Sequence, residues 1–386
     1  MTPGDPPPPL GPTPLGVYIH WPYCARICPY CDFNVVRERG RTAEKAALGQ
    51  AILADLAAHR ALTGPRRVTS IFLGGGTPSL MDPDLAGRII ETCRTLWSPE
   101  ADLEVTLEAN PTDAEADRFA AFRAAGVERL SLGLQALDDA ALKALGRNHD
   151  AATGRRAAER AAAIFPRLSL DLIYARPGQT PAAWTAELRQ AIALGAEHLS
   201  PYQLTIEAGT AFDRAVRRGT LTPPGPDDAA ALYETTQAVL EAAGFEAYEV
   251  SNHAKGPAAR SCHNLVYWRG WDYVGAGPGA HGRLTLDGAR WATMAARGVD
   301  AYIAAAGPAR ERLSPRDQAL ERLLMGLRTL EGVALAELTP LEIPTARLAD
   351  LTALGLIRLD GEGGRLIATD AGRPVLDRLT AEIAGA

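Results

Sequence analysis

Short apolar runs alternate with longer stretches of helical spacing between residues 17 and 204. Leu48, Ile52 and Leu56 illustrate that spacing, because they recur at i, i+4 and i+8 and share one face of a predicted helix. Strands separated by helices pair in parallel through right-handed crossovers. The pattern predicts six such strands, at Val17–His20, Ser70–Leu73, Leu103–Glu108, Arg129–Gln135, Leu168–Tyr174 and His198–Leu204.

This α/β rhythm predicts either an open doubly wound sheet or a complete or partial barrel, and in both folds ligands bind at the carboxyl ends of the strands. Chemically informative residues lie at those ends. A cysteine-rich loop follows the first strand, and a glycine-rich loop follows the second. Glu108 ends the third strand, Gln135 ends the fourth, and Asp171 lies in the fifth. We therefore expect one functional rim.

We expect residues 15–250 to form the core domain that contains these strands, with further segments before and after it. Residues 1–14 contain seven prolines and are expected to be a disordered lead. A seventh β-like stretch, Phe245–Val250, precedes a glycine- and aromatic-rich connecting region, 251–309. Residues 310–386 predict helix, hairpin and helix, a winged-helix outline, with elements at Ala319–Leu330, Thr345–Ala353, Gly355–Leu359, Arg365–Ala368 and Pro374–Ile383.

Charge and composition narrow the class of protein. The net charge is −6 and the pI about 5.7, which disfavours a nucleic-acid partner and favours a packing or lid role for the winged-helix module. No window reaches the ~18 apolar residues of a membrane span, and we expect no signal peptide, because the N-terminal residues include no basic patch or apolar stretch of that kind. Five cysteines, three of them clustered, indicate a reducing compartment. We expect a cytoplasmic protein without a transmembrane segment.

The cluster Cys24, Cys28 and Cys31 is the strongest chemical signal in the chain. A structural zinc site wants four ligands, usually in two Cys-x2-Cys pairs, and this trio has neither feature. A disulfide would leave one of the three unpaired, and the next cysteine is Cys93. Dense cysteine runs commonly hold iron–sulfur clusters. Three ligands on a four-iron cluster would leave one iron open to a further ligand.

The Cys-x3-Cys-x2-Cys spacing, the preceding strand and the aromatic Tyr30 resemble the signature of the radical S-adenosylmethionine (SAM) family. The resemblance implies a [4Fe-4S] cluster whose fourth iron binds SAM. The run Gly74–Pro78 suits a tight turn, since glycine tolerates positive φ, and also close approach to a ligand. It resembles the loop that contacts the SAM amino group in that family, and Glu108 matches the residue that binds the SAM ribose.

Nearly the whole chain from Val17 resembles the oxygen-independent coproporphyrinogen III dehydrogenase branch of this family. Tyr18, Gln135, Arg147 and Asp171 match positions that line the SAM region there, including a second SAM. Together, the resemblance implies metal ligation by Cys24, Cys28 and Cys31 and cofactor contacts from Tyr18, Tyr30, Gly75, Gly76, Thr77, Glu108, Gln135, Arg147 and Asp171.

Two details favour the haem chaperones of that branch. The dehydrogenases carry a fourth cysteine where this chain has Phe33, and the run His263–Trp268 resembles the chaperones' His-Asn-x-x-Tyr-Trp motif. From the residues alone, His263 is either a core imidazole packed among aromatic rings or an axial haem ligand. Cys262 and His281 are alternative ligands, and the sequence does not rank the three.

We therefore expect a partial (β/α)6 barrel followed by a small winged-helix-like domain. The expected function is haem binding and delivery to respiratory haem proteins, with the SAM-liganded cluster required for transfer or regulating it. Radical decarboxylation of coproporphyrinogen III is the alternative, and a DNA-binding regulator is a third. Still open are the number of SAM molecules and whether the chain associates with itself or with a membrane-bound partner.

Overall fold

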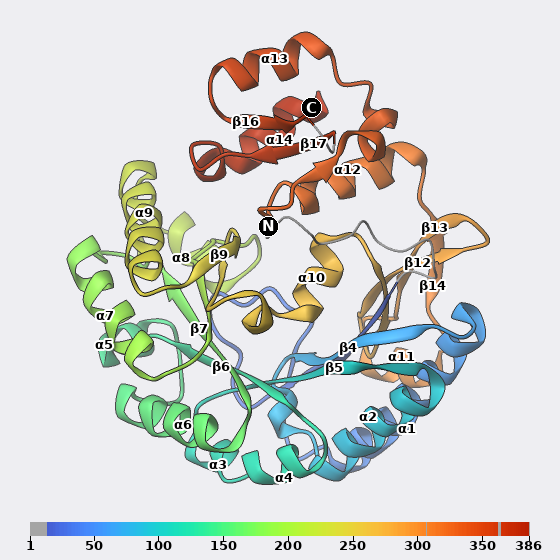
Figure 1. The fold of residues 1–386 in the computed structure, drawn as a ribbon. Coiled ribbons are helices and arrows are strands. Elements are labelled where there is room, and N and C mark those ends of the chain that lie inside the picture. Colours follow the sequence, from blue (N-terminus) through green and yellow to red (C-terminus); the bar gives the residue numbers. More distant parts are fainter. Residues whose placement is uncertain (1–13, 306, 362–363, 386) are drawn as a thin grey trace.

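The computed structural model describes residues 14–305, 307–361 and 364–385. The predicted disordered lead, residues 1–14, therefore lies outside the described residues except for residue 14. In Figure 1 the described chain forms a curved sheet ringed by helices, with the C-terminal residues gathered in a separate layer at one end.

Six parallel strands form the arc of a partial barrel and confirm the predicted fold class. They neighbour one another in chain order, and every neighbouring pair is parallel. The strands are β1 (Leu15–Trp21), β4 (Arg67–Gly75), β5 (Ser98–Ala109), β6 (Arg129–Gln135), β7 (Arg167–Tyr174) and β8 (His198–Gln203).

Helices cover the outside of this arc (Figure 1). Several begin at a side chain that accepts a backbone N–H of the first turn, as Asp82, Asp150 and Thr180 do. The helices are α1 (Thr42–Thr63), α2 (Pro83–Leu96), α3 (Asp113–Ala116), α4 (Phe119–Ala124), α5 (Asp139–Ala144), α6 (Ala151–Ile164), α7 (Pro181–Ala193), α8 (Ala211–Arg217) and α9 (Pro226–Ala242).

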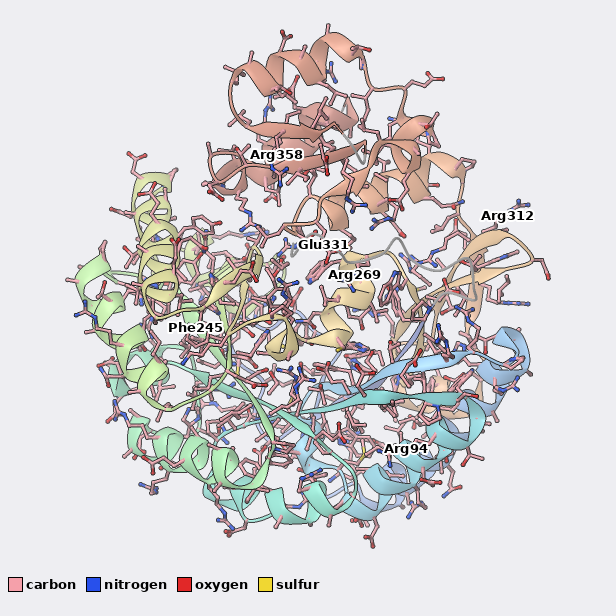
Figure 2. The ribbon with its side chains drawn as sticks, in the orientation of Figure 1. Arg94, Phe245, Arg269, Arg312, Glu331 and Arg358 are labelled. Carbon is pink, nitrogen blue, oxygen red and sulfur yellow. The ribbon has the colours of Figure 1, made fainter. Side chains whose placement is uncertain are left out.

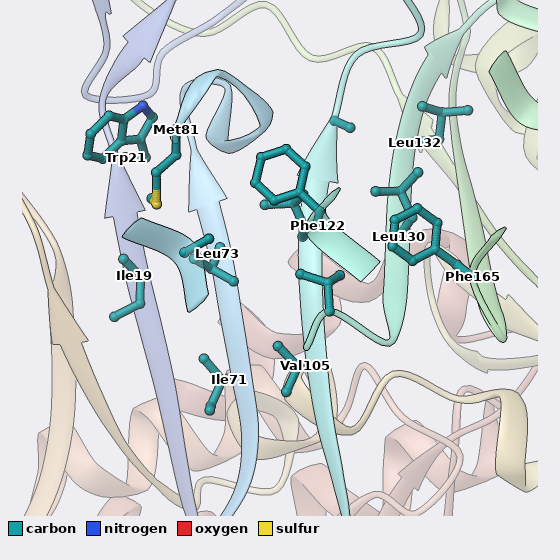
Figure 3. Close-up of a cluster of buried hydrophobic side chains, with 14 of the residues drawn as sticks. Ile19, Trp21, Ile71, Leu73, Met81, Val105, Phe122, Leu130, Leu132 and Phe165 are labelled. Carbon is teal, nitrogen blue, oxygen red and sulfur yellow. The ribbon is translucent and has the colours of Figure 1, made fainter. Parts of the chain in front are cut away.

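The apolar core is a shell between the strands and the outer helices. Successive side chains of a strand point to opposite faces. In the first four barrel strands, Ile19, Ile71, Val105 and Leu130 are fully buried and belong to one hydrophobic cluster (Figure 3). Their neighbours along each strand point into the barrel instead and are mostly polar. This alternation gives the barrel an apolar outer layer and a polar interior.

The sheet is wider than predicted because four further strands extend it beyond β1. They are β11 (Asp272–Ala276), β12 (His281–Leu286), β13 (Ala289–Met294) and β14 (Ala309–Arg312), with α11 (Val299–Ala304) after β13. Glycines obscured two of these strands, β11 and β12, in the sequence. A Cβ on Gly275 would lie 2.0 Å from the His281 carbonyl oxygen, and one on Gly282 2.4 Å from Thr293 Oγ1. Here glycine permits close contact within a strand.

The other edge of the sheet carries the predicted seventh stretch. It forms β9 (Glu246–Glu249), which pairs antiparallel with β10 (Asn252–Ala254). Strand β10 in turn pairs antiparallel with β8, so β9 is the last strand at this edge of the sheet. A separate short parallel pair, β2 (Tyr23–Cys24) and β3 (Val36–Arg37), brackets the cysteine loop.

The C-terminal residues form the predicted winged-helix-like arrangement around a second hydrophobic cluster. Its first helix starts at Pro315 rather than Ala319, because the Ser314 side chain accepts the Asp317 N–H and caps it there. The elements are α12 (Pro315–Gly326), β15 (Val333–Ala334), α13 (Thr345–Ala353), β16 (Ile357–Asp360), β17 (Arg365–Ala368) and α14 (Leu376–Ala384).

Helix α10 (Cys262–Trp268) joins the two layers. Arg269, which ends the helix, pairs with Glu331 of the C-terminal layer, and both are labelled in Figure 2. Arg322 of α12 donates to the Trp268 carbonyl oxygen at 3.0 Å. The α10 segment therefore sits between the barrel and the C-terminal layer and is bonded to the latter at its carboxyl end.

Candidate functional site

A cavity of about 410 Å³ occupies the polar interior of the barrel. Alternate residues of β5 to β8 line it, and these are the inward-facing partners of the outer apolar shell. The lining from these strands is Thr106, Glu108, Ala109, Arg129, Ser131, Gly133, Gln135, Ser169, Asp171, Ile173, His198, Ser200, Tyr202 and Gln203. A concave site with convergent polar groups is the usual form of a small-molecule site.

The three clustered cysteines lie together at the carboxyl-end rim of this cavity. Cys24 is buried at the end of β2, whereas Cys28 and Cys31 are half-buried in the loop, and all three are free thiols. The Cys31 N–H donates to the Cys28 carbonyl oxygen at 3.2 Å, which forms a tight turn. Burial raises the pKa of Cys24 to about 11, and the neighbouring sulfurs of Cys31 and Cys28 add to this rise.

This donor set fits an iron–sulfur cluster better than a single ion. Within the described ranges, no group of three or more His, Cys, Asp or Glu side chains is arranged to hold one metal ion. In a cluster each thiolate binds a different iron, so the sulfurs need not converge on one point. Burial raises the pKa of both Cys24 and Cys31, and bound irons would hold these two sulfurs as thiolates.

The glycine-rich loop packs directly against the cysteine loop. The Gly76 N–H donates to the Trp21 carbonyl oxygen and the Thr77 N–H to that of Tyr23, both at 2.8 Å. A Cβ on Gly76 would lie 2.7 Å from the backbone of Pro22, so the close approach requires glycine. The loop amides are thus occupied, and a ligand ammonium, which donates hydrogen bonds, would require carbonyl oxygens instead.

Two carboxyl groups line the cavity, Glu108 from β5 and Asp171 from β7. Glu108 Oε2 accepts the Gly75 N–H at 3.0 Å, and Asp171 accepts the Ser131 hydroxyl at 2.9 Å. Burial raises the pKa of Glu108 to about 8, with a contribution from Asp171, and burial raises the pKa of Asp171 to about 6. Near neutral pH Glu108 can therefore donate a hydrogen bond to a polar ligand, whereas Asp171 is mainly an acceptor.

Arg147 connects the cysteine loop to the strand ends. Its Nη1 donates to Cys28 Sγ at 3.3 Å, and its Nη2 donates to the Gly133 carbonyl oxygen at 3.1 Å and to Asn110 Oδ1. Asn110 in turn donates to Thr77 Oγ1 at 3.1 Å. Arg147 thus places a cation in hydrogen-bond contact with one of the three expected cluster ligands.

Gln135 reaches the cavity through a strained backbone. Its φ is +65°, which is uncommon for a residue other than glycine, and the β6–β7 register shifts between Gly133 and Gln135. Such a bulge re-aims the side chain that follows it, and here that side chain lines the cavity. Tyr30, from the cysteine loop, lines the same cavity and packs against Phe212 of α8.

Two of the predicted cofactor residues do not line this cavity. Tyr18 donates to or accepts from His20 Nδ1 at 3.0 Å, and its ring stacks on Phe72. His263 is 1% exposed, with Nδ1 2.8 Å from Ser70 Oγ and Nε2 2.7 Å from Tyr267 Oη. Burial lowers the pKa of His263 to about 3. The imidazole occupies the packed-core position, and ligation of haem iron would require one of these bonds to break.

The two alternative ligands differ in exposure. Cys262 begins α10 and is half-buried, and burial raises its pKa. His281 begins β12, and its side chain is exposed. The loop before it is tied to the cysteine loop, because Asn34 Nδ2 donates to the carbonyl oxygens of Pro278 and Arg297 at 2.8 and 2.9 Å.

A buried ionic network at the amino end of the barrel was not predicted. Glu104 is fully buried and lies 3.0 Å from both Arg129 Nε and Arg167 Nη1. Its carboxylate also accepts the His263 N–H at 3.0 Å and so holds the first turn of α10. The signal that could have revealed it is polar alternation within the strands, as in Glu104, Thr106 and Glu108.

Comparisons with known proteins agree with this geometry. The family model described as "Radical SAM superfamily" matches residues 18–191, and "HemN C-terminal domain" matches residues 313–375. The solved structure titled "Coproporphyrinogen III oxidase (HemN) from Escherichia coli is a Radical SAM enzyme" aligns with a TM-score of 0.78 at 21% identity. It covers 97% of this chain and 90% of the other, which establishes the shared fold. Among the described helices, none is both long and apolar enough to cross a membrane.

Curated relatives refine the assignment. Heme chaperone HemW of Mycobacterium tuberculosis is 37% identical over 98% of this chain and 96% of its own length. Heme chaperone HemW of Escherichia coli is 42% identical over 72% of each chain. Radical S-adenosyl methionine domain-containing protein 1, mitochondrial, of Bos taurus is 42% identical over 84% of this chain and 71% of its own. The chain belongs to the heme chaperone HemW family, within the radical SAM superfamily.

Proposed function

We propose that this protein binds haem and delivers it to respiratory haem proteins, and that it carries a [4Fe-4S] cluster with SAM as a ligand. The full-length similarity to HemW of Mycobacterium tuberculosis is the observation that carries this proposal. Phe33 supports it, because that position, a cysteine in the related dehydrogenases, holds an exposed aromatic ring. We place the protein in the cytoplasm.

In this proposal Cys24, Cys28 and Cys31 hold the cluster, whose open iron binds the amino and carboxylate groups of SAM. Glu108 and Asp171 face the space where SAM would lie and bind its polar groups, while Arg147 donates a hydrogen bond to the sulfur of Cys28. The bulged backbone aims Gln135 into the same space. The remaining proposed contacts are Tyr30, Gly75, Gly76 and Thr77, all of which line the cavity. Tyr18 does not line the cavity, so its effect on SAM binding would be indirect.

The haem ligand is proposed among His263, Cys262 and His281. His263 would require α10 to release a bond to Ser70 or Tyr267, whereas His281 is exposed. Haem titration of the cluster-loaded wild type, His263→Ala and His281→Ala compares the candidates by their visible spectra. Retained haem affinity with an altered spectrum identifies the axial ligand. A cluster-loaded wild type that fails to bind haem contradicts the proposal.

A radical decarboxylase is the alternative function. Anaerobic incubation of the cluster-loaded protein with SAM, a reductant and coproporphyrinogen III separates the two functions. We expect no catalytic turnover of the porphyrinogen. Formation of protoporphyrinogen over many turnovers would show an enzyme instead of a chaperone.

A further inference from the structure

A second cavity, of about 250 Å³, lies between the barrel and the C-terminal layer, and we call it the interlayer cavity. Strands β11, β12 and β13 contribute to its lining, together with the end of α10, helix α12 and Glu337. Figure 1 shows α12 beside α10, and the bond from Arg322 to the Trp268 carbonyl oxygen joins the two helices. Among the described residues, none lines both this cavity and the cluster cavity, so the two are separate.

One face of α12 lines the interlayer cavity and is mostly polar. Residues at i, i+3, i+4 and i+7 share a face of a helix, and here that set is Gln318, Glu321, Arg322 and Met325. A helix face that packs on another layer is ordinarily apolar. The apolar face of α12, which includes Leu323, is buried in the C-terminal hydrophobic cluster instead. The cavity is therefore bounded by side chains that can bind a polar ligand.

The charged lining has an excess of one positive charge, because three arginines and two glutamates line the cavity. They are Arg283, Arg290, Arg322, Glu321 and Glu337. Asp272, which pairs with Arg290, does not remove this excess, because it also pairs with Arg66. An excess of guanidinium groups favours a ligand that carries a negative charge.

Arg283 keeps free donors for such a ligand. Its Nε and Nη2 donate to Glu321, and its Nη1 donates to the Gly282 carbonyl oxygen at 3.0 Å. A guanidinium has five N–H donors, and these contacts use three of them. The remaining donors lie in one plane, a geometry that matches the two oxygens of a carboxylate.

The hydroxyl group of Tyr273 is a second free donor. Its ring packs edge-on against Tyr267 with the ring centroids 4.6 Å apart, but its hydroxyl has no hydrogen-bond partner among the described residues. Burial raises the pKa of Tyr273, so the hydroxyl stays protonated and can donate. The charges of Arg283, Glu321 and Arg290 also act on this pKa, so the hydroxyl lies close to the charged lining of the cavity. It can therefore donate to the same ligand as Arg283.

Aromatic rings and a methionine supply the apolar part of the lining, at Tyr267, Trp271, Tyr273 and Met325. Flat apolar groups pack well on aromatic rings, and the flexible methionine side chain adapts to their shape. At about 30 Å³ for each water in the liquid, 250 Å³ corresponds to on the order of ten non-hydrogen atoms. One aromatic ring with one carboxylate has this size.

We propose that the interlayer cavity is a binding site for a small aromatic carboxylate. Its carboxylate accepts hydrogen bonds from Arg283 and Tyr273, and its ring lies among Tyr267, Trp271 and Met325. The site is independent of the cluster, SAM and haem. Because such a ligand contacts both the barrel and the C-terminal layer, its binding stabilises the folded arrangement of the two.

Fluorine NMR of 4-fluorobenzoate, added to the cluster-loaded protein with saturating SAM, tests the charge and the hydroxyl. We expect a Kd on the order of 1 mM or tighter. The neutral isostere 4-fluorobenzamide should bind roughly tenfold more weakly, and Tyr273→Phe should weaken 4-fluorobenzoate binding by a similar factor. Tyr233→Phe, at a half-buried tyrosine of α9 outside the cavity, is the matched control and should retain wild-type affinity. Equal binding of the two probes, or unchanged affinity in Tyr273→Phe, overturns the proposal.

A pair of neighbouring substitutions on α12 tests the position of the site. Met325→Glu places a carboxylate in the cavity and should abolish the rise in Tm that 4-fluorobenzoate causes. Leu324→Glu is its control, because Leu324 is 50% exposed and does not line the cavity, and this variant should keep the rise. Both variants leave the interlayer ion pairs in place, and their Tm without ligand shows whether they fold. An equal ligand-dependent rise in Tm in the two variants would locate the probe elsewhere and refute the site.

Discussion

Glu104 links the barrel to the first turn of α10, and replacing it with glutamine isolates its charge. The side chain is fully buried, and its carboxylate lies 3.0 Å from Arg129 Nε and from Arg167 Nη1. Glutamine has nearly the same shape and can still accept the His263 N–H. The substitution therefore removes the negative charge while it preserves most of the packing.

The magnitude follows from the two cations left behind. Arg129 is 1% exposed and would lose its carboxylate partner, whereas Arg167 is partly exposed and retains Glu197 at 3.5 Å. Breaking a buried pair by removing one partner costs about 3–5 kcal/mol. Since the amide still accepts a hydrogen bond, we expect Glu104→Gln to lower the free energy of unfolding by about 3 kcal/mol.

Urea denaturation followed by circular dichroism measures this loss. Asp117→Asn is the control, because its ion pair with Arg160 is exposed and should contribute under about 1 kcal/mol. A double-mutant cycle with Arg129→Met should show a coupling of about 2–3 kcal/mol. A loss in Glu104→Gln no larger than that of the Asp117 control, or an additive cycle, would refute the reasoning.

Three other substitutions test the site and its surroundings. Cys28→Ala should abolish the visible absorption of the reconstituted cluster, whereas Cys93→Ala, at a buried cysteine outside the cavity, should retain it; equal cluster content in both would contradict the ligand assignment. Burial lowers the pKa of His253 to about 3, so below pH ~6.5 the unfolded chain binds a proton that the folded protein excludes. Between pH 8 and pH 5 the wild type should lose about 2 kcal/mol more stability than His253→Gln, and parallel losses in urea titrations would disprove this. Gln135→Gly should relieve the positive φ and raise the free energy of unfolding by roughly 0.5–1 kcal/mol, while it weakens SAM binding ~fivefold; unchanged SAM affinity would remove Gln135 from the site.

The barrel and the cysteine rim were predictable because both follow from local patterns. Helical spacing between β-like runs predicted all six barrel strands, and the carboxyl-end rule predicted that Cys24, Glu108 and Asp171 would share one cavity. The alternation of polar and apolar residues within the strands contained information that the prediction did not use. Polar residues at every second position of β5 to β8 already indicate a polar barrel interior, including Ser169 and Ser200.

The surroundings of His263 were not predictable from its motif. Its burial depends on Ser70 and Phe72 of β4 and on Glu104 of β5, which are distant in sequence and meet it only when the barrel forms. The strands β11 and β12 escaped prediction for a related reason. Their glycines are required by contacts between strands, and local propensity does not encode those contacts.

The position of α10 between two hydrophobic clusters has a consequence for how the chain unfolds. Its amino end is bonded to Glu104 of the barrel, and its carboxyl end is bonded to Arg322 and, through Arg269, to Glu331 of the C-terminal layer. Melting either layer would leave these charges without partners on the other. We therefore expect a single calorimetric transition for the described layers, with equal van't Hoff and calorimetric enthalpies, instead of two separate melting events.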